Sequence, residues 1–199
     1  MRKKDIVKYM KVTGLTVVFN KIKTLSLNNS YVRETVKIVY KRSIIFMEKT
    51  LVILKPSAVQ RGLIGEVTSR FERKGLILTG TKMIQLDDEI LSDHYSHLKD
   101  KPFFQRVKNS MKASPVIVQC WEGAEAVAVV RALVGKTNGR EATAGTIRGD
   151  YSISFQENIV HASDSVEAAK VELARFFKEN EIFEYKKAVL SFLYSNDEI

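Results

Sequence analysis

The chain has 199 residues, a formal net charge of +9 and a single cysteine, Cys120. No run of about eighteen apolar residues occurs, so no membrane-spanning segment is predicted. A single cysteine cannot form an internal disulfide, which is typical of proteins in the reducing cytoplasm. We therefore expect a cytoplasmic protein without a membrane span.

The positive charge is confined to residues 1–46. They contain eleven Lys or Arg and two acidic residues, whereas residues 47–199 carry twenty-one of each sign. Such an extension could bind nucleic acid or a membrane surface, or direct the chain to an organelle. Met47 directly precedes the first predicted strand, so we favour the interpretation that residues 1–46 arise from a start codon placed too early. A disordered or organelle-directing arm is the alternative, and residues 47–199 are expected to form one domain.

Strand and helix patterns alternate along this domain. In chain order we expect a strand at 50–55, a helix at 63–74, a strand at 76–86, two short helices within 88–112, a strand at 115–121, a helix at 123–134, a loop at 136–152, a strand at 157–161 and a helix at 165–178. A further short helix could lie within 183–194. The order βαββαβ predicts an α/β fold of the ferredoxin-like α+β sandwich type, in which helices cover one face of a four-stranded antiparallel sheet and further helices are added.

The last predicted strand ends in a histidine, His161, next to a helix start. Asp164 can cap that helix, and Glu167 can close a capping box with it. A lone histidine in this position is more often structural than catalytic. Its neighbours in sequence decide between the two.

Cations gather in the loop that precedes this strand. Arg148 lies between glycines, and Arg131, Lys136 and Arg140 lie just upstream. A guanidinium group has a planar fork that suits phosphate oxygens, and a long loop between packed elements is uncommon unless it is functional. If these cations converge on His161, the sequence predicts a site that handles phosphate.

Several segments at matching spacing resemble the nucleoside diphosphate kinase family from Lys49 to Phe183. The run Asn158–Ser165 resembles the motif around the phosphorylated histidine of that family, with Ala162 in place of a glycine. The other matching segments are Leu54–Pro56, Val59–Gly62, His94–Tyr95, Lys101–Phe104, Trp121–Gly123 and Gly145–Asp150.

The resemblance implies that His161 accepts the γ-phosphoryl group of a nucleoside triphosphate, chiefly ATP, and passes it to a nucleoside diphosphate by a ping-pong mechanism that maintains NTP and dNTP pools. Glu172 would orient the histidine, and Phe103 would stack on the base. The other residues implied to bind the nucleotide are Lys55, Tyr95, Arg131, Thr137, Arg148 and Asn158. The implied cofactor is Mg²⁺, which bridges the substrate phosphates, with no protein metal ligand assigned. A homo-oligomer, a hexamer or a tetramer, is also implied.

Two motifs point elsewhere and are set aside. The stretch from Gly75 to Lys82 nearly matches a P-loop, but its lysine is displaced by one position. His94 and His97 have the spacing of a metal pair, yet without a third ligand in the sequence nearby we interpret them as part of a solvated helix face.

The chain also departs from the family pattern. Ser57 and Ala58 stand where aspartate and glycine are common, and Phe155 replaces a smaller apolar residue beside the base. Gly139 and Ala144 replace two loop prolines, which predicts a freer loop. The competing hypothesis is a non-catalytic nucleotide- or nucleic-acid-binding protein on the same fold, although nucleic acid is not the expected partner.

Overall fold

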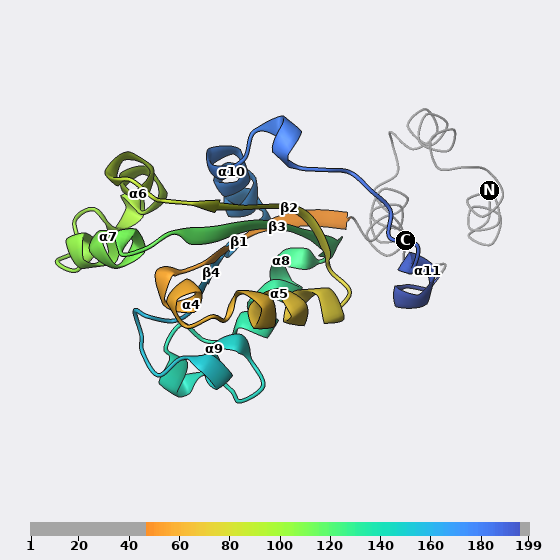
Figure 1. Cartoon of the computed structure of the whole chain (residues 1–199), viewed down its shortest axis with the longest axis horizontal. Helices are drawn as coiled ribbons and strands as arrows, with labels where there is room; N and C mark the ends of the chain where they lie inside the picture. Colours follow the sequence, from red (N-terminus) through yellow and green to blue (C-terminus); the bar gives the residue numbers. More distant parts are fainter. Residues whose placement is uncertain (1–46, 196–199) are drawn as a thin grey trace, which may run out of the picture. The chain divides into compact units, whose positions relative to one another are not determined.

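The computed structural model describes residues 47–195, so the predictions for residues 1–46 lie outside the described residues. Its strands are β1 (Met47–Leu54), β2 (Ile77–Ile84), β3 (Val116–Ala124) and β4 (Val160–Ala162). They form one antiparallel sheet in the order β2-β3-β1-β4 (Figure 1). The predicted ferredoxin-like fold is confirmed.

Helices pack on both faces of this sheet (Figure 1). The crossover helices α5 (Ile64–Arg73) and α8 (Ala126–Val134) cover one face, where Val52 and Trp121 pack with Phe71. The opposite face is covered by α6 (Asp88–His94), α7 (Phe104–Lys112) and α10 (Val166–Phe176), where Leu51 packs with Leu173. Strand β1 is therefore buried on both sides, which explains its uninterrupted apolar run.

The segment predicted as a loop at 136–152 contains two short helices. They are the 3₁₀ helix η2 (Gly139–Glu141) and the α-helix α9 (Ile147–Tyr151). Thr146 caps α9 by accepting a hydrogen bond from the Gly149 amide. The loop prediction was wrong here because a helix this short leaves little periodicity in the sequence.

Two other local predictions need correction, the start of β4 and the cap of α10, and two short elements were not predicted. Strand β4 begins at Val160 rather than at 157. A short helix, α4 (Pro56–Gln60), follows β1 with proline in its first turn. The cap of α10 is Ser165, whose hydroxyl accepts from the Ala168 amide at 3.1 Å, and not Asp164. A 3₁₀ turn, η1 (Ser96–Leu98), separates α6 from α7.

The C-terminal segment runs along the edge strand β2. It contains η3 (Glu179–Glu181) and α11 (Leu190–Leu193), the latter within the predicted range 183–194. The Phe183 amide donates to the Thr79 carbonyl, the Tyr185 hydroxyl to Leu78, and Lys187 to Leu76. These contacts protect backbone groups that an edge strand would otherwise expose. Across residues 47–195, no helix combines the length and apolar character needed to cross a bilayer.

Candidate active site

A cavity of about 600 Å³ opens beside β4. It gathers residues from the ends of β1 and α6, from α8, α9 and α10, and from β4 itself. All the predicted site residues except Phe103 line it: Lys55, Tyr95, Arg131, Thr137, Arg148, Asn158, His161 and Glu172. Residues separated by more than a hundred positions therefore share one pocket.

His161 is held from behind by a carboxylate on α10. Its Nε2 lies 2.9 Å from Glu172 Oε1, and the Ser163 hydroxyl donates to Glu172 Oε2 at 2.5 Å. Burial alone would raise the pKa of Glu172, but the hydrogen bond and charge of His161, with help from Ser163, hold it at about 2. The carboxylate is thus ionised at neutral pH and favours the tautomer with a proton on Nε2. That tautomer leaves a lone pair on Nδ1.

His94 packs directly against His161. The two rings meet edge-on, with centroids 4.6 Å apart, and His94 is only 6% exposed. The solvated helix face predicted for His94 is therefore wrong, although His97 is exposed. Burial, with a contribution from His161, lowers the pKa of His94 to about 3, so this ring is neutral at pH 7.

The cluster of His94, His161 and Glu172 has the spacing of a metal site, since one ligand atom from each lies within 4.8 Å of the others. Glu172, His161 Nε2 and His94 Nδ1 already have partners, however, although His94 Nε2 has none within residues 47–195. Glu172 accepts from His161 and Ser163, and the Arg175 guanidinium lies 3.4 Å from His94 Nδ1. A fixed positive charge beside the cluster opposes a cation. The contacts fit a hydrogen-bonded support for His161 better than a metal centre.

A strained turn leads into the histidine strand. Ile159 has φ +70°, and the Val160 amide donates to the Asn158 carbonyl at 2.8 Å, which defines a γ-turn with positive φ. This conformation is unfavourable for a β-branched residue and persists only where neighbours enforce it. The Lys55 amide donates to the Ile159 carbonyl, and Arg148 donates from Nε to Asn158 and from Nη2 to Val160. The Arg148 side chain and the Lys55 backbone thus hold the turn just before His161 in place.

Lys55, Arg131 and Arg148 bring positive charge into the cavity, whose lining also includes carboxylates. Lys55 Nζ donates to Asn158 Oδ1 at 2.6 Å, and burial followed by the charge of Arg148 lowers the pKa of Lys55 to about 8. Burial followed by the charge of Arg131 lowers the pKa of Arg148 to about 10. Arg148 uses three of its N–H groups on backbone carbonyls, and a guanidinium has five. Two donors remain for an anion.

The remaining predicted residues lie around this centre. Tyr95 is buried, and burial with the charge of Glu172 raises its pKa well above the usual range, so its hydroxyl stays protonated. Arg131 and Thr137 are exposed on the rim, and the Thr137 carbonyl accepts from Asn158. Phe103 is 38% exposed at the start of α7 and is not brought to the cavity lining.

Sequence reasoning missed three supporting residues, Ser163, His94 and Arg175. Ser163 could have been found because it lies two positions after His161, on the same side of an extended chain. Arg175 lies three positions after Glu172 on one helix face. His94 lies in the matching segment His94–Tyr95, but its burial depends on how α6 packs and could not be predicted from the sequence.

The chain is similar to several known proteins. A family model described as nucleoside diphosphate kinase matches residues 48–182. Among curated proteins, the nucleoside diphosphate kinase of Parabacteroides distasonis is 68% identical over 152 residues, which cover 76% of this chain and 99% of that protein. Nucleoside diphosphate kinase A of Rattus norvegicus is 43% identical over 147 residues, covering 74% of this chain and 97% of that protein.

Solved structures are similar as well. A halophilic nucleoside diphosphate kinase from Halobacterium salinarum, in complex with CDP, superposes with a TM-score of 0.73 at 39% identity and covers 75% of this chain and 99% of its own. A nucleoside diphosphate kinase family protein from Babesia bovis gives a TM-score of 0.72 at 42% identity, with 74% of this chain and 100% of its own covered.

Proposed function

This chain belongs to the nucleoside diphosphate kinase family and is an enzyme of nucleotide phosphotransfer, and we propose that it works by a ping-pong mechanism through phosphorylated His161. The observation that carries the proposal is the Glu172–Nε2 contact, because it directs a nucleophilic lone pair to Nδ1. We propose ATP as the chief donor and the maintenance of NTP and dNTP pools as the role.

The proposed chemistry has two half-reactions. His161 Nδ1 attacks the γ-phosphorus of the triphosphate, an N–P bond forms, and the bond from phosphorus to the β–γ bridging oxygen breaks. The departing diphosphate keeps that electron pair. A terminal oxygen of an acceptor diphosphate then attacks the phosphohistidine and the N–P bond breaks. The imidazole becomes positively charged as it is phosphorylated, and Glu172 lies where it stabilises that charge.

Positive side chains supply the electrostatic part of the mechanism. Phosphoryl transfer depends mainly on positioning and on charge aimed at the phosphoryl oxygens. Arg148 lines the cavity with His161 and has two N–H groups that no backbone carbonyl uses, Lys55 is held by Asn158, and Arg131 lies on the rim. We propose that these residues bind the phosphates, that Tyr95 and Thr137 bind the rest of the triphosphate and the sugar, and that Phe103 stacks on the base.

We propose Mg²⁺ as the cofactor, carried on the nucleotide phosphates. The cations Lys55, Arg131 and Arg148 in the cavity suit phosphate oxygens rather than a bare metal ion. Asp164 is an exposed carboxylate on the same lining and could hold the water shell of the ion. When bound, Mg²⁺ would neutralise phosphate charge.

Further proposals concern setting and assembly. We propose a cytoplasmic enzyme, which the buried free thiol of Cys120 supports, and a homo-oligomer of four or six chains. Residues 47–199 would be the catalytic domain, with residues 1–46 outside it.

Initial rates with ATP and GDP test the mechanism. A ping-pong enzyme gives parallel double-reciprocal lines when one substrate is varied at several concentrations of the other. Intersecting lines would contradict a phosphoenzyme. Binding of ATP without formation of GTP would instead favour a non-catalytic nucleotide-binding protein.

A further inference from the structure

The helix that carries Arg148 is short and lacks the prolines that would stiffen its loop. Inside residues 143–151, Thr146 Oγ1 donates to the Thr143 carbonyl at 2.6 Å and accepts from the Gly149 amide at 3.1 Å. Asp150 Oδ1 accepts from the Gly145 amide at 2.7 Å. A five-residue helix gains little from its own hydrogen bonds. An external support for α9 is therefore expected.

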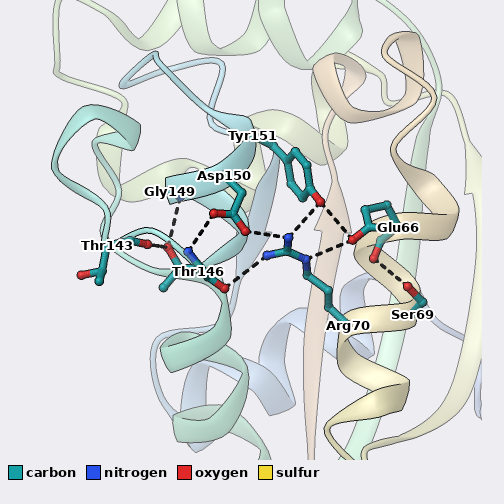
Figure 2. Close-up of polar contacts among 9 residues, drawn as sticks. Glu66, Ser69, Arg70, Thr143, Thr146, Gly149, Asp150 and Tyr151 are labelled. Atoms are coloured by element: carbon teal, nitrogen blue, oxygen red, sulfur yellow. Dashed lines mark hydrogen bonds and ion pairs between the residues drawn. The ribbon is translucent and has the colours of Figure 1, made fainter.

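Arg70 on α5 supplies contacts at both ends of α9, as Figure 2 shows. Its Nη1 donates to the Gly145 carbonyl at 3.2 Å, before the helix. Its Nη2 lies 2.6 Å from Asp150 Oδ2 and donates to the Tyr151 hydroxyl at 2.8 Å, at the end of the helix. The guanidinium also lies 4.7 Å from the centre of the Tyr151 ring.

The far side of Arg70 is fixed as well. Its Nε lies 3.3 Å from Glu66 Oε1, one turn earlier on α5, and the Tyr151 hydroxyl donates to the same oxygen at 2.9 Å (Figure 2). The neighbouring residues Val67 and Phe71 are fully buried in the core. The guanidinium thus joins α5 to both ends of α9, beyond the core contact that the fully buried Ile147 gives α9.

We propose that Arg70 is a positioning residue that sets Arg148 for phosphoryl transfer; this rests on the function proposed above. Arg148 lies between the two anchor points, Gly145 and Asp150, so the clamp fixes the segment from which its side chain extends. Arg148 in turn holds the carbonyls of Asn158 and Val160, on either side of the strained turn before His161. The clamp also supplies a constraint where Gly139 and Ala144 lack a fixed φ.

Replacing Arg70 with methionine keeps most of the side-chain length and removes every polar contact. Because a displacement of about 1 Å at a catalytic group can cost about a hundredfold in rate, we expect kcat to fall by about tenfold or more, with a smaller change in KM. Arg70→Lys keeps the positive charge but not the planar guanidinium fork, so its kcat should lie between those of the wild type and Arg70→Met. Arg73→Met is the matched control, because Arg73 is exposed on the same helix, and it should keep the wild-type rate.

A double-mutant cycle separates positioning from general stability. Arg148→Lys should lower kcat, and adding Arg70→Met to it should cost far less than Arg70→Met costs in the wild type, because both changes act through Arg148. Equal, multiplicative losses in the two backgrounds would overturn the proposal. Thermal unfolding of each variant shows that the assay temperature lies in the folded range.

Two further measurements test whether Arg70 holds α9 in place. Tyr151→Phe removes a hydroxyl that accepts from Arg70 and donates to Glu66, and it should lower kcat by about two- to fivefold. Hydrogen exchange at the Gly149 and Asp150 amides should accelerate in Arg70→Met but not in Arg73→Met. Unchanged exchange would refute the clamp. Faster exchange in a protein that transfers no phosphoryl group would instead refute the proposed function.

Discussion

Replacing Glu172 with glutamine removes the negative charge behind His161 while keeping the shape of the side chain. The amide oxygen can still accept from Nε2 at the observed 2.9 Å, and the amide NH₂ can donate to the Ser163 hydroxyl, which now donates to Glu172. The geometry is therefore retained. What changes is the electrostatic support for the imidazole as it becomes a phosphorylated cation.

The size of the effect follows from the kind of hydrogen bond that is lost. A hydrogen bond with a charged partner contributes about 1.5–3 kcal/mol, against about 0.5–1.5 kcal/mol for a neutral one. The difference of about 1–2 kcal/mol corresponds to a fall of about 5- to 30-fold in the rate of phosphorylation. The Glu172 side chain is only 13% exposed, so solvent screens little of this.

Single-turnover phosphorylation of the enzyme by ATP, followed by rapid quench, measures this rate directly. Glu172→Gln should slow it within that range and leave the affinity for ATP largely unchanged. Glu89→Gln is the control, because Glu89 is exposed on α6. A wild-type rate in Glu172→Gln would refute the idea that the carboxylate stabilises the phosphorylated imidazole.

Three other changes test the pKa shifts and the helix cap. Because the pKa of Lys55 is about 8, its charge is lost as the pH rises through 8. KM for ATP should therefore rise above pH 8 in the wild type but not in Lys55→Arg. Equal rises in KM would exclude Lys55 as the cause. The folded-state pKa of His94, about 3, lies below the ordinary histidine pKa of 6.5. As the pH falls below 6.5, the unfolded chain therefore binds the proton first and stability falls. Urea unfolding should show about 2 kcal/mol less stability at pH 5 than at pH 7.5 from this group, and His94→Phe should lose that dependence; an unchanged dependence would contradict it. Ser165→Ala should lower the free energy of unfolding by about 1 kcal/mol, and Asp164→Ala should lower it much less. A larger loss in Asp164→Ala than in Ser165→Ala would show that Asp164 is the cap.

The arrangement of strands and helices in this protein could largely be predicted from its sequence. The strand and helix patterns predicted the sheet, because residues 51–54 form an uninterrupted apolar run that is typical of a strand buried on both faces. The resemblance then placed the candidate site residues, and all but Phe103 line the cavity. Their roles remain proposals.

The features that could not be predicted from the sequence are those that depend on tertiary contacts. His94 looks like a residue of a polar helix, and its burial arises only when α6 packs against β4 and α10. Helix α9 is too short to show periodicity, and Arg70 holds it from a segment seventy-five positions away. Ser165 and Asp164 are both residue types that favour the N-cap, and the local backbone conformation determines which of them caps α10.

Phosphoenzyme formation tests the central claim most directly. Purified protein mixed with γ-labelled ATP and Mg²⁺, without acceptor, should acquire label that is acid-labile and base-stable and that moves to GTP when GDP is added. The label should be absent in His161→Ala and present in His97→Asn, a histidine exposed on η1. A wild-type chain that produces GTP without becoming labelled, or a His161→Ala variant that still carries the label, would contradict the histidine relay.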